Sequence, residues 1–590
     1  MMDPQKRPLL DRMIEHQMRN FDREFLALRT RRGPDYNYHT NVRNRDVHMI
    51  RESFYLALML LDRQKEGDAE LAGAIIGSLL DYQELNPDSP LYGIWPYYIE
   101  EPLAEMGAVD RNWADFCGKS LIQAVADYGF MFPKALMERM LTAVEAAATA
   151  ITRRNVLPSY TNICVMGVYV TLLAGEITGK AELLQYGRDK LKSLHEYCMY
   201  HGAFTEYNSP TYTLVVIEDL SLILRHVKDE KSLALIRELH DMAWAMIASH
   251  YHAPTGQWAG PHSRSYDTLQ GKSFLSFLQL ASGGRLHLLD ESDVETGALA
   301  ARAGLHMPEV AVPYFQGAGG TSYTVTSIVK GKVPITAASY MSQAFTLGSF
   351  NHCDLWNQRR ALSAYWGTPG RAGYLRFRCL HDGYDFSSGL IHTVQHRNKL
   401  IGIANLCTDH GDKHFHLDPI QGTLEVSSLL YRFELGGEEA NIVPVETEGA
   451  SVIFLIRSVN VVIGLVLAAC AFDSSVPRIQ VKKENGLSAI DVVLCEGEAA
   501  QLDLGSLTEA YLAFGLVIEH STCSDEEMFR NISSVQADVE AGIVRIQYAD
   551  EFKELELTAP VGPHPFKAAM QNAKGTAALR IEKEAPVWSV

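Results

Sequence analysis

The chain of 590 residues is 47% hydrophobic and 21% charged, and its formal net charge at pH 7 is −18. This length exceeds what one hydrophobic core usually serves, so more than one domain is expected. The acidic balance argues against a nucleic-acid partner, because a phosphate backbone needs a basic footprint. An anionic small substrate remains open, since a few arginines in a cleft can outweigh the average field.

The N-terminal segment has no apolar run or small-residue cleavage site of the kind that marks a secretory signal. No uninterrupted apolar stretch reaches the length of a membrane span, so we expect no membrane partner. The nine cysteines are scattered without CxxC pairs, which is typical of reduced thiols. Together these features predict a cytoplasmic protein.

The first half of the sequence has helical periodicity, with apolar residues at intervals of three and four. The clearest segments are 50–63, 68–82, 116–128, 133–152, 162–178, 181–199, 210–227 and 230–249. Their connections carry Gly, Pro, Asn and Asp, which suggests antiparallel helix pairs. An α/α toroid or a superhelical solenoid fits this pattern, and the lack of a fixed-period repeat favours a toroid over residues 1–300.

In the second half the apolar period changes to two, which predicts strands. The stretches 323–341, 450–469 and 477–496 alternate in this way, and Glu484-Asn485-Gly486 predicts a tight hairpin turn. We expect residues 301–590 to form an antiparallel β-sandwich or more than one, with the crossing between the halves inside 285–312. The predicted fold class is therefore α+β and multidomain, an N-terminal α/α toroid followed by a C-terminal antiparallel β-sandwich.

One segment of the second half resembles a metal site. Asp409 and His410 are followed by Asp412, His414 and His416, and residues two apart on a strand face the same side. His410, His414 and His416 are weak candidate ligands of a structural divalent metal. A polar turn is the alternative interpretation of the same residues.

Four clusters combine polar and aromatic side chains: 158–162, 204–213, 257–266 and 348–360. The first three are expected at helix ends or loops on one rim of the toroid. The fourth is expected to cover that rim from the β half. Domain junctions are favoured places for ligand clefts, so these clusters predict a binding site.

The residue types in these clusters suit β-elimination from a uronic acid. The sugar carboxylate must be neutralised before the poorly acidic C5 proton can leave, and an amide or a cation can do this. A Tyr or His within hydrogen-bond reach can remove that proton and protonate the departing O4. If a histidine is the base, activity should rise as it loses its proton at about pH 6–7.

The order of the two predicted domains, a helical toroid followed by a β-sandwich, resembles that of the heparinase II/III-like and alginate-lyase-like polysaccharide lyases. The segment 202–212, GAFTEYNSPTY, is similar to the family segment that carries the proton-transfer tyrosine, which implies this role for Tyr212. The segment 158–175 resembles the helix whose Asn-His pair handles the carboxylate, which implies this role for Asn162. Ile163 replaces the expected histidine. The resemblance of SFNHCDLW to a β-domain segment then favours His352 as the missing histidine, with His262 as the other candidate.

The predicted site divides into two sets. The catalytic candidates are Tyr212, His352, His262, Asn162 and Arg264. The candidates for substrate binding are Tyr160, Glu206, Asn208, Trp258, Tyr266, Asn351, Trp356 and Arg360. Alternatives with a purely structural role stay open: Asn162 as a helix cap, Glu206 and Asn208 as residues that order their loop, and the tryptophans as core.

The sequence thus predicts a lyase that acts without a required cofactor on short uronate-containing oligosaccharides, in an exo-like manner. A glycoside hydrolase is the second hypothesis and would need two carboxylates across the bond, for which Glu206 with Asp219 or Asp267 are the near candidates. A carbohydrate-binding protein without catalysis is the third. Neither the polysaccharide nor the oligomeric state follows from the sequence.

Overall fold

The computed structural model describes residues 7–35, 39–295, 300, 302–317, 320–411, 422–445, 451–550 and 553–577. The chain divides into two compact units. The helical unit comprises Met1–Met199, Tyr212–Trp244 and Lys272–Pro308, and the β unit comprises Tyr200–Thr211, Ala245–Gly271 and Glu309–Val590. Two of the polar-aromatic clusters that we expected on the toroid rim, 204–213 and 257–266, therefore lie almost entirely in segments of the β unit.

The helical unit is built from helices within one or two residues of most of the predicted segments. They are α1 (Arg7–Met18), α2 (Ile50–Arg63), α3 (Asp68–Leu79), α4 (Trp113–Tyr128), α5 (Lys134–Arg154), α6 (Thr161–Thr178), α7 (Ala181–His201), α8 (Tyr212–His226), α9 (Glu230–Ala248) and α10 (Lys272–Ala281). A small sheet of β1 (Phe21–Asp22), β2 (Ala27–Arg31) and β3 (Asp46–Met49) precedes α2. Alternate helices α2, α4, α6 and α8 contact one another in that order, while α3 packs on α2 and α5 on α4 and α6. This inner and outer row is the arrangement of an α/α toroid, as the sequence predicted.

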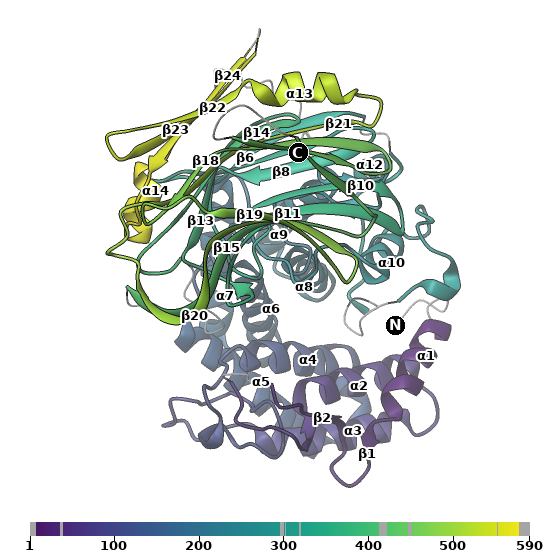
Figure 1. Cartoon of the computed structure of the whole chain (residues 1–590). Helices are drawn as coiled ribbons and strands as arrows, with labels where there is room; N and C mark the ends of the chain where they lie inside the picture. The colour runs from purple at the N-terminus through teal and green to yellow at the C-terminus, as the bar shows by residue number, and fades with distance from the viewer. Residues whose placement is uncertain are drawn as a thin grey trace. The chain divides into compact units, whose positions relative to one another are not determined.

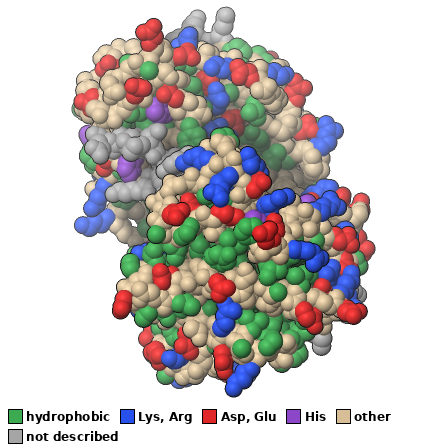
Figure 2. All heavy atoms as spheres, turned by 90° about the horizontal axis from the view of Figure 1, so that it is seen from below, with side chains coloured by type: hydrophobic (Ala, Val, Ile, Leu, Met, Phe, Trp, Pro, Cys, Tyr) green, Lys and Arg blue, Asp and Glu red, His purple; other side chains and the backbone are tan. Residues whose placement is uncertain are grey.

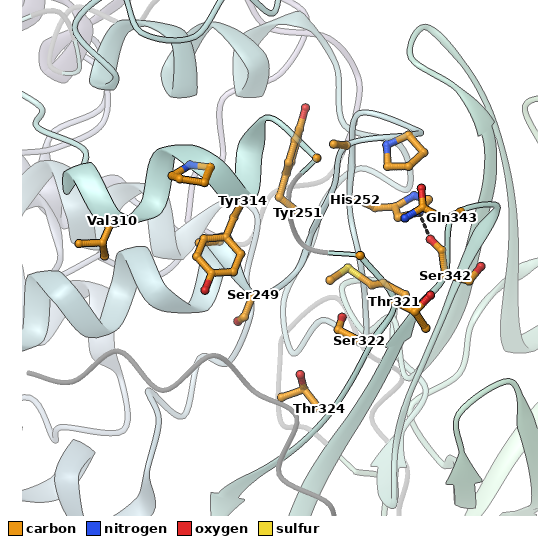
Figure 3. Close-up of a pocket in the computed structure, with 17 residues that line it drawn as sticks. Ser249, Tyr251, His252, Val310, Tyr314, Thr321, Ser322, Thr324, Ser342 and Gln343 are labelled. Atoms are coloured by element: carbon orange, nitrogen blue, oxygen red, sulfur yellow. Dashed lines mark hydrogen bonds between the residues drawn. The ribbon is translucent and has the colours of Figure 1, made fainter.

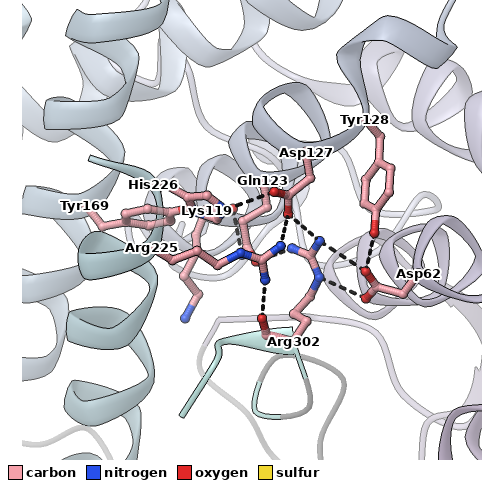
Figure 4. Close-up of polar contacts among 9 residues, drawn as sticks. All are labelled: Asp62, Lys119, Gln123, Asp127, Tyr128, Tyr169, Arg225, His226 and Arg302. Atoms are coloured by element: carbon pink, nitrogen blue, oxygen red, sulfur yellow. Dashed lines mark hydrogen bonds and ion pairs between the residues drawn. The ribbon is translucent and has the colours of Figure 1, made fainter. Parts of the chain in front are cut away.

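A buried arginine joins the inner helices of this unit (Figure 4). Arg302 is 3% exposed and donates from Nε to Asp62 Oδ2 at 3.0 Å and from Nη2 to Asp127 Oδ2 at 2.8 Å. It also donates to the amide oxygen of Gln123. His226 lies 3.1 Å from the second oxygen of Asp127. The cluster thus ties α2, α4 and α8 to the last segment of the helical unit.

Helix α6 is the one helix of the described residues that is long and apolar enough to cross a membrane by composition. Its most apolar stretch is 83% buried within the structure. That burial explains the composition, because a helix that is apolar all round and enclosed by other helices belongs to a core.

The described residues of the β unit form three antiparallel sheets and a short β4–β5 hairpin. In chain order the strands are β4 (Tyr251–His252), β5 (Gln257–Trp258), β6 (Ser322–Val329), β7 (Ile335–Met341), β8 (Phe345–Phe350), β9 (His352–Asp354), β10 (Leu362–Thr368), β11 (Arg371–His381), β12 (Tyr384–Asp385), β13 (Gly389–His396), β14 (Lys399–Leu406), β15 (Thr423–Gly436), β16 (Asn441–Val445), β17 (Val452–Arg457), β18 (Val461–Phe472), β19 (Arg478–Glu484), β20 (Leu487–Asp503), β21 (Ala510–His520), β22 (Val535–Glu540), β23 (Ile543–Asp550), β24 (Lys553–Pro560) and β25 (Lys574–Ala577). The α-helices α12 (Val312–Phe315), α13 (Asp525–Ser533) and α14 (Phe566–Asn572) accompany these strands in the described part of the unit.

The largest sheet has the order β19-β20-β15-β11-β10-β8-β7-β6, with β12 beside β11. The second sheet has the order β16-β17-β18-β21-β14-β13-β9, and the third β22-β23-β24-β25. Phe514 of the second sheet contacts the rings of Phe377 and Phe433 of the first, with centroids 5.4 and 5.0 Å apart. These aromatic contacts form a core between two facing sheets, which confirms the predicted antiparallel β-sandwich.

The central strands β14 and β21 of the second sheet are buried on both faces, since successive residues of a strand point to opposite sides and nearly all of theirs are buried. Ala513 and Val517 of β21 face away from the aromatic core and pack in a cluster with Met528 of α13 and Val544 of β23. Figure 1 shows α13 lying along β21. A third layer therefore covers the sandwich.

The predicted hairpin turn at Glu484-Asn485-Gly486 is present. Glu484 pairs with Leu487, and Asn485 and Gly486 have φ of 50° and 78°. Positive φ at both central residues matches the right-handed twist of the flanking strands, and Asn-Gly adopts it at little cost.

The acidic net charge is not gathered into one patch on the face drawn in Figure 2. Lys and Arg side chains alternate there with Asp and Glu over the described surface. That face therefore offers neither a broad basic patch for a polyanion nor a broad acidic patch.

Candidate functional site

A pocket of about 500 Å³ in the β unit combines a histidine with charged side chains. Its polar lining comes from Thr205 and Ser263 in the two early segments of this unit, from His352, Asp354 and Arg359 around β9, and from Lys567 of α14. Ile328, Val333, Ile335, Phe350, Phe566 and Met570 supply apolar walls. A concave apolar site with a few converging polar groups is the usual form of a small-ligand site. We call it the His352 pocket.

His352 is held by a second histidine on the neighbouring strand. The register of β9 and β13 places His352 opposite His392, and their Nδ1 atoms lie 2.8 Å apart. Burial lowers the pKa of His352 to about 4 and that of His392 to about 3, so both rings are neutral at pH 7. The sequence expectation of a histidine that titrates at about pH 6–7 is therefore corrected, because desolvation disfavours the imidazolium.

The tautomers of the two histidines follow from what surrounds His392. Its Nε2 and the Oδ1 of Asn405 are both buried without a hydrogen-bond partner among the described residues, and the Asn405 side chain acts to raise the pKa of His392. A proton on Nε2 of His392 suits that amide oxygen. Nδ1 of His392 then accepts from Nδ1 of His352, which leaves a lone pair on Nε2 of His352, as a general base requires.

The charges around the pocket favour an anion. Arg359 donates from Nε to Asp354 Oδ1 at 3.0 Å and from Nη1 to the carbonyl of Ser263 at 2.5 Å. Lys567 is exposed, and no ion pair joins it to another described residue. With the histidines neutral, two cations and one carboxylate leave the pocket with one net positive charge, in a chain that is otherwise acidic.

His262 does not face this pocket. It is 0% exposed, its Nδ1 lies 2.6 Å from the carbonyl of Asn208, and its Nε2 lies 3.1 Å from the carbonyl of Trp258. Burial lowers its pKa to about 3. These contacts give His262 a structural position, so the structure does not support it as a base that reaches a substrate.

Asn208 and Trp258 are also structural. Asn208 is 0% exposed, adopts φ of 48°, and donates from Nδ2 to the carbonyls of Ala259 and Pro261 at 2.8 and 3.0 Å. Its Oδ1 accepts from the indole of Trp258, which is itself 0% exposed. The structure contradicts the predicted sugar contacts of both residues, because they cross-link the segments 200–211 and 245–271 instead.

The predicted residues Glu206, Arg264 and Trp356 form a second cross-link. Arg264 lies 3.5 Å from Glu206 and donates from Nε to Gln358 Oε1 at 2.7 Å. Its guanidinium also lies 5.4 Å from the ring of Trp356, which is 1% exposed. Trp356 is therefore covered and is not a platform for a sugar. Glu206 orders its loop, as the alternative interpretation held.

Three further predicted residues hold loops of the β unit. Arg360 is 3% exposed and donates to the carbonyls of Asn357 and Tyr266 at 2.7 and 3.2 Å. Asn351 accepts from the amide of Thr336 and donates to the carbonyl of Pro334. Tyr266 is 57% exposed, Asn351 is half-buried and Arg360 is buried.

Tyr160, Asn162 and Tyr212 belong to the helical unit. Helix α6 begins at Thr161 with Tyr160 at the N-cap, so Asn162 lies inside the first turn and is not the cap. Asn162 is 2% exposed. Tyr212 is half-buried and begins α8, and Ser209 before it donates from Oγ to the carbonyl of Arg264 at 2.6 Å.

The metal prediction can be compared with the structure only in part. His410 is described and half-buried, whereas His414 and His416 lie outside the described residues. Within the described part of the chain, no group of three His, Cys, Asp or Glu side chains is placed to hold a metal ion.

Sequence reasoning missed His392 and Lys567. His392 stands inside a buried strand, where its neighbours show only strand periodicity, and Lys567 lies in a short helix more than 200 residues beyond the quoted clusters. Arg359 and Asp354 stood in the fourth cluster, but no motif separated them from their neighbours. The pairing of β9 with β13 brings His392 beside His352, and the sequence does not reveal which strands pair.

The family described as "Domain of unknown function (DUF8769)" matches residues 11–283. A search of curated protein sequences finds no match. Among solved structures, the chain is similar to one titled "Crystal Structure of Heparinase III", with 10% identity, a TM-score of 0.45, and coverage of 95% of this chain and 91% of the other. It also aligns with endoglucanase CelQ from Clostridium thermocellum complexed with cellotriose, with 8% identity, a TM-score of 0.19, and coverage of 82% and 85%. Similarities at these scores do not decide a function.

Proposed function

We propose that this protein is a lyase that cleaves the bond to a uronic acid in an oligosaccharide by β-elimination. The observation that carries the proposal is the His352 pocket, where a neutral imidazole with an available lone pair lies near two cations. The family resemblance of the segments around Tyr212, Asn162 and His352 adds the choice of reaction.

Each group in the pocket has a task in that reaction. Arg359 and Lys567 would bind the sugar carboxylate and stabilise the negative charge that builds up on it as the C5 proton leaves. Nε2 of His352 would take that proton, and His392 would keep the ring in the tautomer that can accept it. The apolar walls would exclude water from the carbanion.

Elimination balances without a further reactant. The C5–H electron pair forms the C4–C5 double bond, the C4–O4 bond breaks, and the leaving oxygen takes a proton. We propose Tyr212 as the donor of that proton and Asn162 as a further donor to the carboxylate. Both assignments rest on the family resemblance.

We propose that the enzyme requires no cofactor and that it acts in the cytoplasm on short oligosaccharides.

A glycoside hydrolase is less well supported. Asp219 is 0% exposed and paired with Lys119 at 2.8 Å, and Glu206 is paired with Arg264. Inverting and retaining hydrolysis both need two carboxyl groups that face the substrate. Neither of these carboxylates is presented in that way.

The test is a screen of uronate-containing oligosaccharides for the ultraviolet absorbance of a 4,5-unsaturated product. Elimination creates this conjugated enol ether, and hydrolysis does not. We expect new reducing ends and absorbance to appear in equal amounts. New reducing ends without absorbance would establish a hydrolase, and neither signal with any uronate substrate would reject catalysis on this class.

A further inference from the structure

A second pocket of about 560 Å³ in the β unit differs from the His352 pocket in its chemistry. Its described lining contains no Asp, Glu, Lys or Arg. Figure 3 shows Tyr314 on one side, Thr321 and Ser342 on the other, and Ser322 and Thr324 below. We call it the hydroxyl pocket.

The histidine of the hydroxyl pocket is uncharged. Nε2 of His252 lies 2.8 Å from the carbonyl of Ser342, and Nδ1 lies 2.8 Å from Oγ1 of Thr255. The neutral ring can satisfy both hydrogen bonds by donating to the carbonyl and accepting from the hydroxyl. Burial lowers the pKa of His252 to about 4, so the pocket carries no charge at pH 7.

Several polar groups at this pocket have no protein partner. Oγ of Ser322 is buried without a hydrogen bond among the described residues. The side chains of Thr321, Thr324 and Gln343 also line the pocket, and the described structure shows no hydrogen bond to any of them. Thr321 and Gln343 are open to solvent and Thr324 is half-buried, whereas the buried hydroxyl of Ser322 would normally be paired, so its state indicates a ligand or water that pairs with it.

The geometry points to a neutral sugar residue as the ligand of the hydroxyl pocket. Hydroxyl and amide side chains both donate and accept, as the hydroxyls of a sugar do. The ring of Tyr314 and the side chains of Val310, Pro313 and Met341 supply apolar contact for the carbon face of the ring. Without a cation in the lining, the pocket offers nothing to pair with a carboxylate or a phosphate.

This site is separate from the proposed catalytic pocket and does not depend on it. The two share no lining residue. Ser322 and Met341 pair at one end of the β6–β7 hairpin and line the hydroxyl pocket, whereas Val329 and Ile335 pair at the other end and line the His352 pocket. Seven residues of strand separate these ends, which is roughly 23 Å. The protein would therefore hold a neutral sugar at a distance from the reacting uronate.

Saturation-transfer NMR of the full chain with methyl glycosides of glucose, galactose, mannose, fucose and rhamnose tests the inference, with methyl glucuronide as the charged comparator. At least one neutral glycoside should bind saturably and more tightly than the glucuronide. Thr324→Val removes one hydroxyl and keeps the side-chain shape, so it should weaken binding about two- to tenfold. Tyr314→Ala should weaken binding further.

Two controls make the result decisive. Thr423→Val changes an exposed strand threonine outside both pockets and should bind normally. His352→Ala should also bind normally, which separates this site from the proposed lyase activity. The inference is overturned if no neutral glycoside binds, or if Thr324→Val binds as the unaltered protein does. Thr324→Val suffices for the test if Tyr314→Ala does not fold.

Discussion

Nε of Arg302 donates to Oδ2 of Asp62 at 3.0 Å, although the two residues lie 240 positions apart in the sequence. Their side chains are 1% and 3% exposed. Arg302 also reaches Asp127, which Arg225 contacts as well, so one buried cation links carboxylates on two inner helices. Desolvation of the charged groups opposes the formation of such a cluster, but removal of one member leaves a buried charge with less compensation.

Replacement of Arg302 by Met should lower the free energy of unfolding of the helical unit by about 3–5 kcal/mol. Urea unfolding followed by circular dichroism measures this loss. Arg139→Met is the matched control, because Arg139 forms an exposed pair with Asp81. That control should change stability by less than about 1 kcal/mol. Equal effects of the two substitutions would show that the buried cluster contributes no more than a surface pair.

His352→Ala should reduce kcat/KM for elimination by about 10²–10⁴-fold, the usual contribution of a general base. In the unaltered enzyme, activity should stay constant down to about pH 5 and fall as the pH passes through the His352 pKa of about 4, because the protonated ring cannot accept the C5 proton. His564→Ala, at an exposed histidine of the same unit, should keep full activity. An active His352→Ala would remove the base from this pocket.

Tyr212→Phe should keep the fold and KM but lose most of kcat, since only the phenolic proton is removed. A proton donor is worth about 10²–10⁴-fold. Single-turnover kinetics with a uronate substrate measures the chemical step directly. If the variant retained more than about a tenth of normal kcat, the donor would be another group.

Asn162→Ala distinguishes a role of Asn162 in catalysis from a role in packing. Tyr160 holds the N-cap of α6, so the substitution removes no cap, although it empties space at a position that is 2% exposed. If Asn162 assists the carboxylate, kcat should fall about 10²-fold or more. A variant that melts earlier but turns over normally would assign Asn162 to packing alone.

The β unit should lose stability in acid. Burial lowers the pKa of His250 to about 4 and those of His262 and His392 to about 3, from an ordinary value of 6.5. Between pH 6.5 and these values the unfolded chain binds protons that the folded unit excludes, so stability falls as the pH decreases. Each histidine should cost roughly 1–2 kcal/mol by pH 5.

Melting temperatures measured from pH 8 to pH 5 would reveal this loss. His392→Gln should melt earlier at pH 8, because the buried pair with His352 is broken. It should then show a smaller decrease between pH 8 and pH 5 than the unaltered protein. An unchanged slope would mean that folding does not lower the pKa of His392.

Most elements of the fold were predictable because their signal is local. The predicted segment 50–63 coincides with α2, and the turn at Asn485-Gly486 was readable from two residues. Helix starts were less accurate: the predicted segment 210–227 begins two residues before α8, which starts at Tyr212.

The candidate site was predictable only in part, because residue type does not reveal burial. His262, Asn208 and Trp258 have the chemistry of a sugar site, yet all are 0% exposed and bonded to one another. His352 was found through its motif. Its partner His392 was not, because their proximity depends on the pairing of two strands 40 residues apart.

The β unit is made of three separate pieces of chain, and this has a consequence for synthesis. Segments 200–211 and 245–271 leave the ribosome before any strand of the large sheets, joined early through Asn208 and Trp258. Their contacts with residues such as Gln358 and Arg359 can form only after those residues have been synthesised. The helical unit, for its part, gains Arg302 only after helix α10 has been synthesised. A translation product that ends at residue 300 therefore contains neither a finished helical unit nor a finished start of the β unit, and it should be a substrate for chaperones and proteases.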